Sequence, residues 1–150
     1  MAITKDSGRQ DALWARLVVG YADGKNVFDD GTATEAIDLP AGAIVTGGYV
    51  RVNTVFNSTT SDALVVGDGV DDNRYIAACD LQTLGHYHFI MGDVLTANTT
   101  SATVGPGYKY PGADTVDIKW TAGTANTATT GEFEIVLSYI VEDRACEVQG

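Results

Sequence analysis

Two histidines separated by one residue are the first candidates for chemistry in this chain. His86 and His88 occur in the segment GHYHF, and residues two apart on a β-strand lie on the same face. Such a pair can supply two ligands to zinc, but a zinc site needs a third and usually a fourth ligand. No partner cluster is evident in the sequence. Structural or surface roles are therefore the preferred interpretation, and a pH-sensitive contact is the second one.

The segment GDGVDDN gathers acidic residues around glycines and is the second candidate. Asp68, Asp71 and Asp72 could offer several oxygen ligands to a hard cation such as calcium. The spacing lacks the alternating acids and the terminal bidentate Glu of the EF-hand loop. An acidic turn is the favoured interpretation, and ion binding by these residues stays open.

Catalytic constellations are not found in the sequence. No Gly-x-Ser-x-Gly elbow holds a nucleophile, and the two histidines stand in no triad context. Acidic residues fall mainly in turns and on the solvent alternates of predicted strands, where they would not form the paired carboxylates of a glycosidase. Gly47-Gly48 lacks the Lys-Ser/Thr and the helix of a phosphate loop. We therefore predict a protein that is not an enzyme and has no catalytic residue, cofactor or metal ligand.

Aromatic residues raise the question of a contact surface. Tyr108 and Tyr110 lie in the loop-rich segment GYKYPG, where exposed aromatic side chains often make contacts. A sugar-stacking face is one alternative and a role in the core is another, for the set Trp14, Tyr21, Tyr49, Tyr108, Tyr110 and Trp120. The candidate interface residues are Tyr108, Tyr110, Trp14 and Arg144.

Composition limits the class of partner. The chain has 150 residues and a formal net charge of −11, with nine Lys and Arg against twenty Asp and Glu. Binding to nucleic acid or to an anionic membrane surface depends on clustered Lys and Arg, so both partners are disfavoured. No apolar run approaches the ~18 residues of a bilayer span, and no apolar segment follows the first charges as in a secretory signal. We expect a cytoplasmic site of synthesis.

The two cysteines give a weak signal. Cys79 lies in the apolar run YIAACDL and is expected to be a small buried hydrophobe, whereas Cys146 lies in the polar C-terminal tail. A reducing cytoplasm disfavours a disulfide between them, and their separation matches no zinc motif.

Alternation of apolar and polar residues predicts an all-β protein. In LPAGAIVTGGYVRVNTVFN, Val50, Val52, Thr54 and Phe56 should share one face of a strand. Over residues 74–83 a short helix is the alternative to a strand. Similar patterns, separated by turn-rich loops, predict strands near 13–21, 35–39, 44–57, 63–66, 74–81, 85–91, 115–120 and 132–141.

About eight strands without intervening helical patterns indicate an antiparallel β-sandwich or barrel in a single domain, residues 1–150. Long strands near both ends of the chain, paired in one sheet, are common in jelly rolls. The fold prediction is a jelly-roll-like antiparallel β-sandwich, with residues 1–11 and 143–150 as extended arms or tails.

Four segments carry a resemblance to a known group of proteins. They are the stretch from Leu39 quoted above, TSDALVVGDGVDDNRYIAACDLQTLG, GYKYPGADTVDIKW and GEFEIVLSYIVEDRA. Together, from Leu39 to Ala145, they resemble small structural proteins of tailed bacteriophages, most closely the head decoration or cement proteins. Residues before Leu39 carry less of the pattern.

This resemblance implies a virion protein on the capsid exterior, made in the host cytoplasm, that binds the major capsid protein and stabilises the shell. It also implies a homo-oligomer, with a trimer favoured over a dimer. We expect Met1–Asp11, Asp143–Gly150 and the Thr96–Gly112 loop to make the contacts between subunits. A fibre, tail or collar β-domain, a carbohydrate-binding module and a small hydrolytic enzyme remain as alternatives.

Overall fold

The predicted alternation is present as β-strands in the computed structural model, which describes residues 11–23, 31–89, 107–122 and 127–142. Within these residues the strands in chain order are β1 (Leu13–Gly20), β2 (Ala33–Leu39), β3 (Ala43–Thr54), β4 (Asp62–Gly67), β5 (Ile76–Asp80), β6 (Gly85–His88), β7 (Asp114–Ala122) and β8 (Glu132–Val141). The only helical turn in the described chain covers residues 21–23. The helix considered near 74–83 does not form, because β5 occupies its centre.

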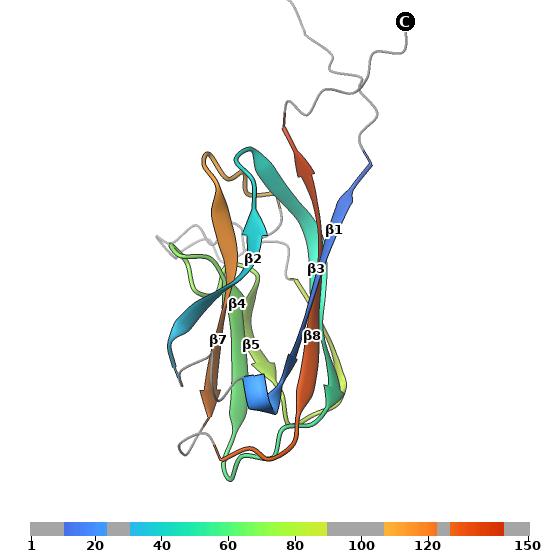
Figure 1. The fold of residues 1–150 in the computed structure, drawn as a ribbon, viewed down its shortest axis with the longest axis vertical. Helices are drawn as coiled ribbons and strands as arrows, with labels where there is room; N and C mark the ends of the chain where they lie inside the picture. The colour runs from blue at the N-terminus through green and yellow to red at the C-terminus, as the bar shows by residue number, and fades with distance from the viewer. Residues whose placement is uncertain (1–10, 24–30, 90–106, 123–126, 143–150) are drawn as a thin grey trace, which may run out of the picture.

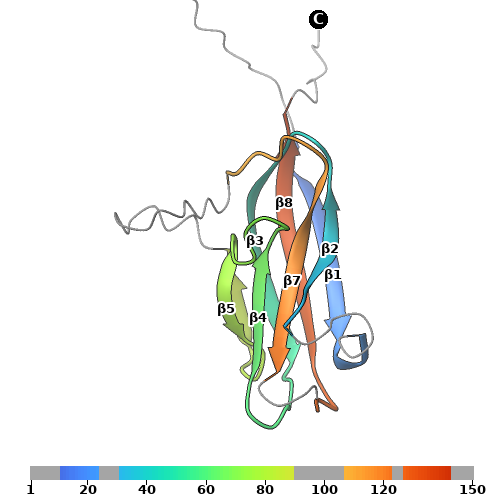
Figure 2. The same ribbon diagram turned by 90° about the vertical axis from the view of Figure 1, so that its left-hand side faces the viewer.

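The strands form two four-stranded antiparallel sheets that pack face to face (Figure 1). One sheet has the order β1-β8-β3-β6 and the other has the order β2-β7-β4-β5. Successive strands cross from one sheet to the other, except for β4 and β5, which pair as neighbours. The predicted all-β, antiparallel β-sandwich of about eight strands is therefore confirmed. Figure 2 shows the second sheet from its outer side.

The long strands near the two ends of the chain pair with each other. β1 and β8 are antiparallel from Leu13 opposite Tyr139 to Gly20 opposite Glu132. β8 also pairs with β3, so it is a central strand of its sheet. The bounds of β8 agree with the predicted 132–141, and its pairing with β1 is a finding of the structure.

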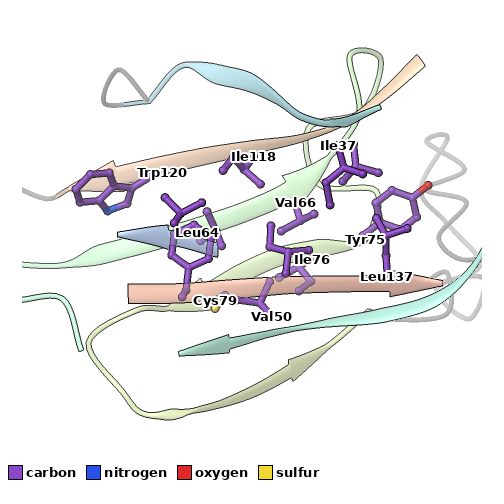
Figure 3. Close-up of a cluster of buried hydrophobic side chains, with 14 of the residues drawn as sticks. Ile37, Val50, Leu64, Val66, Tyr75, Ile76, Cys79, Ile118, Trp120 and Leu137 are labelled. Atoms are coloured by element: carbon purple, nitrogen blue, oxygen red, sulfur yellow. The ribbon is translucent and has the colours of Figure 1, made fainter. Parts of the chain in front are cut away.

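Apolar residues from both sheets fill the space between them (Figure 3). Leu64 and Ile118 from one sheet meet Val50 and Leu137 from the other, and all four are almost fully buried. Phe56 packs edge-on against Trp120, with ring centroids 5.3 Å apart. Burial of this apolar area is the main force that holds the two sheets together.

Two irregularities in β3 change which residues face the core. The register against β8 shifts between Val45 and Gly47 and again between Val52 and Thr54. The first shift allows Val45 and Val50 to point inward although five positions separate them. The second leaves Thr54 exposed, so the prediction that Thr54 shares the buried face of Val50, Val52 and Phe56 is wrong. A bulge cannot be read from period-two alternation alone.

Candidate interaction surface and buried polar clusters

The acidic segment 68–72 forms the loop between β4 and β5, and its first carboxylate is buried. Asp68 is 1% exposed and accepts a hydrogen bond from Nε of Arg74, whose side chain is also buried. Backbone N–H groups of Val70 and Asp71 donate to Oδ1 of Asp68 at 3.0 and 2.8 Å. Removing two charges from water is costly, and a buried ion pair offsets this cost only when further hydrogen bonds satisfy its remaining polar atoms. Here the loop backbone supplies those hydrogen bonds.

Two tyrosine hydroxyls complete this buried cluster. The hydroxyl of Tyr110 donates to Oδ2 of Asp68 at 3.1 Å, which leaves its oxygen to accept from Tyr75 at 2.7 Å. Burial raises the pKa of Tyr75 to about 12 and also raises the pKa of Tyr110. Both hydroxyls therefore stay protonated and act as donors at neutral pH. The cluster joins the β4–β5 loop to the segment before β7.

Tyr108 and Tyr110 are brought together as the sequence suggested, but in different environments. Their rings meet edge to face with centroids 5.0 Å apart, and the guanidinium carbon of Arg74 lies 3.9 Å from the Tyr108 centroid. Tyr110 is completely buried, so the interface prediction for its side chain is wrong and its role is in the core. Tyr108 is half-buried on the same cluster.

All three acids of the loop have partners within the chain. Asp71 accepts the backbone N–H of Asn73 at 3.3 Å, and Asp72 is paired with Nζ of Lys119 at 2.6 Å. No group of three or more His, Cys, Asp or Glu residues with the geometry of a metal site is found in the described part of the chain. Beside the loop lies a shallow, open and mostly polar hollow lined by Val65, Val70, Asp71, Asp72, Asn73, Ala77 and Lys119.

The outer face of sheet β1-β8-β3-β6 contains the two histidines and Trp14, which the sequence analysis named as candidates. Arg16, Val136, Tyr49 and His88 stand opposite one another and form one row across the four strands. The next row is formed by Val18, Glu134, Arg51 and His86. We call this surface the arginine–aromatic face.

The two histidines do lie on one face, as predicted. Both are exposed, and their rings flank Tyr49 edge-on with centroid distances of 5.7 Å for His86 and 6.1 Å for His88. Trp14 lies on the same face of β1 and is 68% exposed. Arg144 lies outside the described residues, as do 1–10, 96–106 and 143–150 of the predicted contact segments.

Glu134 is a functional candidate that sequence reasoning missed. It lies on the polar alternates of β8, as expected, yet its side chain is only 3% exposed because two arginines cover it. Arg16 donates through Nε and Nη2 to Oε2 of Glu134 at 2.8 and 2.6 Å, and Nη2 of Arg51 lies 2.7 Å from Oε1. The sequence does place opposite charges on three predicted strands. Only the pairing register of those strands, however, shows that the two arginines lie beside Glu134.

The outer face of the other sheet is acidic. Glu35 stands directly opposite Asp117, with Asp38 further along β2 and Asp80 on β5. Burial, followed by the charges of Glu35, Asp114 and Asp68, raises the pKa of Asp117, and a hydrogen bond from Thr115 at 2.6 Å acts in the opposite direction. Lys119 is the one basic residue of this face among the described strands. We call this surface the acidic face.

Cys79 points into the core, as its apolar neighbours predicted. It is 1% exposed, and burial, reinforced by the charge of Asp80, raises the pKa of its thiol to about 12. Cys146 lies outside the described residues. In the described part of the chain no helix is long and apolar enough to cross a bilayer.

Neither a family model nor a curated protein sequence matches the chain. Solved structures do match over nearly its whole length. A chain of the cyanophage Pam1 capsid asymmetric unit is 24% identical, with a TM-score of 0.56, and the match covers 94% of this chain and 91% of that one. A chain of the capsid of Ralstonia phage GP4 is 18% identical, with a TM-score of 0.59 and coverage of 94% and 90%.

A third match is a chain of the acid-stable capsid of Helicobacter pylori bacteriophage KHP30. It is 15% identical, with a TM-score of 0.52, and the match covers 87% of this chain and 89% of that one. The chain thus shares its β-sandwich fold with chains found in three phage capsid structures. At these identities the likeness concerns the fold.

Proposed function

We propose that this protein is a structural component of a phage virion that binds the outer surface of the capsid and stabilises it. The observation that carries the proposal is the match over most of the chain to chains from three phage capsid structures. The resemblance from Leu39 to Ala145 supports the same role independently. Its segments fall on β3, the β4–β5 hairpin, β7 and β8, which form the framework of the sandwich.

A decoration role needs a rigid body and contact surfaces, and it needs no catalysis. The polar groups in the interior serve the fold: Asp68 is held by Arg74 and Tyr110, and Asp62 accepts the indole N–H of Trp120 at 3.1 Å. We propose accordingly that the protein is not an enzyme. Its partners are the major capsid protein and further copies of itself, with a trimer favoured over a dimer.

The charge of the chain suits an exterior position. A net charge of −11 keeps free copies apart and is repelled by packaged nucleic acid. Synthesis in the host cytoplasm, followed by addition to assembled shells, fits the same picture. Many shallow contacts repeated over a lattice would supply the avidity.

Binding to shells tests this proposal. Purified protein is mixed with empty capsid shells that lack it, the shells are sedimented, and bound copies are counted as a function of concentration. We expect saturation at a fixed stoichiometry and shells that withstand more heat. Absence of co-sedimentation would overturn the proposal and favour a fibre, tail or collar position. Glycan binding would then be measured, although Trp120 and Tyr110 lie in the core rather than on a sugar-stacking face.

A further inference from the structure

The arginine–aromatic face differs from the rest of this acidic protein. Trp14 is exposed to 68% and Val18 to 39%, and they flank Arg16 on β1. Tyr49, Arg51 and the two histidines continue the face across β3 and β6. Trp, Tyr and Arg are the residues that dominate binding energy in protein interfaces. The composition therefore indicates a docking surface for another protein.

The arginines on this face are held in place before any partner arrives. Glu134 is buried beneath them and bonds both, so the guanidinium groups lie over the central strand β8. Arg16 and Arg51 still expose 60% and 42% of their side chains. Two guanidinium groups that share one carboxylate keep a positive charge and free N–H donors for an incoming acceptor.

We propose that the arginine–aromatic face docks onto a carboxylate-bearing surface of the capsid subunit. Charge complementarity carries the choice of partner. Arg16 and Arg51 share the single carboxylate of Glu134 and stay exposed, whereas Glu132, in the next row of the same face, already accepts a hydrogen bond from the amide of Asn53 at 3.0 Å. This inference rests on the proposed function and adds which face is used and which chemistry recognises it.

A second copy of this chain is the competing occupant, since the acidic face would complement the arginine–aromatic face. The two faces belong to opposite sheets of the sandwich and point in opposite directions (Figure 1). Front-to-back contacts between copies would therefore continue as an open stack instead of closing into a ring. A closed oligomer cannot be built from this front-to-back contact, so the acidic face of a second copy is not the occupant that we propose for the arginine–aromatic face.

Four variants in the shell-binding assay test the inference. Trp14→Ala removes the exposed ring, and Arg16→Glu reverses the charge over Glu134. Val70→Ala, at an 82% exposed apolar residue of the β4–β5 loop, and Lys119→Glu, on the acidic face, are the matched controls. We expect binding to weaken at least about tenfold for the first two and to change less than about twofold for the controls.

Arg16→Ala provides a second charge variant in case Arg16→Glu disturbs the sheet, and thermal unfolding checks that each variant is folded. Sedimentation velocity of the free protein gives the oligomeric state. If the wild type binds shells and all variants bind equally well, this inference is overturned and the proposed function stands. Loss of self-association in the Trp14 or Arg16 variants would also overturn it, by assigning the face to contacts between copies. Absence of wild-type binding would overturn both proposals.

Discussion

Two buried carboxylates in this protein are each paired with arginine, and they serve different purposes. Asp68 and Arg74 are both enclosed, and with the hydroxyl of Tyr110 the ion pair holds the β4–β5 loop against the segment before β7. Glu134 is enclosed, but its partners Arg16 and Arg51 remain half-exposed on the outer face. The same pairing of charges thus fixes a loop in one place and presents guanidinium groups to solvent in the other. What differs is whether water reaches the cation.

The largest difference between the two sites should appear when the carboxylate is neutralised. Asp68→Asn leaves the guanidinium of Arg74 buried without a counter-charge, and we expect a loss of about 3–5 kcal/mol of unfolding free energy. Glu134→Gln leaves arginines that water can still solvate, and we expect about 1 kcal/mol. Urea unfolding followed by tryptophan fluorescence measures both. Equal losses would show that exposure of the cation does not separate the two sites.

Backbone packing at the Asp68 loop provides a second contrast. A Cβ atom on Gly67 would lie 2.0 Å from the carbonyl oxygen of Asp71, which is part of the loop backbone. Gly67→Ala should therefore displace the loop and cost about 2–3 kcal/mol. Gly47 on β3 has ordinary space beside Ser138, so Gly47→Ala should change stability by less than about 1 kcal/mol. Thermal unfolding of the pair checks this, and a neutral Gly67→Ala would mean that the loop is free to move.

Removal of one hydroxyl tests whether the Asp68 cluster acts as a connected network. In Tyr110→Phe, Asp68 loses a donor and the hydroxyl of Tyr75 loses its acceptor, so we expect about 1–2 kcal/mol of destabilisation. Tyr87→Phe is the control, because its hydroxyl donates to the carbonyl of Asp80 on the exposed surface and should contribute about 0.5 kcal/mol. Equal effects in chemical denaturation would argue against a special contribution from burial.

The sequence predicted the strands well because alternation reports directly on which side of a sheet is buried. The bounds of β8 and the exposure of Trp14 on β1 could both be anticipated from the pattern of neighbouring residues. Polar clusters were not predicted. Alternation places Glu134 on the outer face, but only the register with β1 and β3 shows that two arginines cover it.

Tyr110 illustrates the same limit in a loop. Pro and Gly around it indicate a turn, and an exposed aromatic residue is the usual expectation there. Its burial depends on Asp68, which is far away in sequence and comes close only when the β4–β5 hairpin packs beside it. Local patterns contain no information on such a contact.

Asp117 is another buried carboxylate and differs from Asp68 and Glu134, since no cation bonds to it among the described residues and Glu35 stands directly opposite. Its native pKa is raised above the unfolded value of about 3.9, mainly by burial. The native state therefore holds the proton more tightly than the unfolded state does. By linkage, stability contributed by this group is present at low pH and is lost as pH rises through the window between the two pKa values.

Replacing the Asp117 carboxylate should stabilise the protein, and this is the smallest change in unfolding free energy that we expect from these test substitutions. Asp117→Asn keeps an oxygen to accept from Thr115 and removes the repulsion with Glu35, so we expect a gain of about 0.5 kcal/mol at pH 7. Well below the unfolded-state pKa of about 3.9, where Asp117 is protonated in both the native and the unfolded state, the gain should vanish. Asp38→Asn is the control, because Asp38 stands opposite Thr115 and no acid, and it should leave stability unchanged at either pH. A loss of stability in Asp117→Asn at neutral pH would mean that this carboxylate has a stabilising partner, as Asp68 and Glu134 have. The contrast between carboxylates paired with arginine and the unpaired Asp117 would then fail.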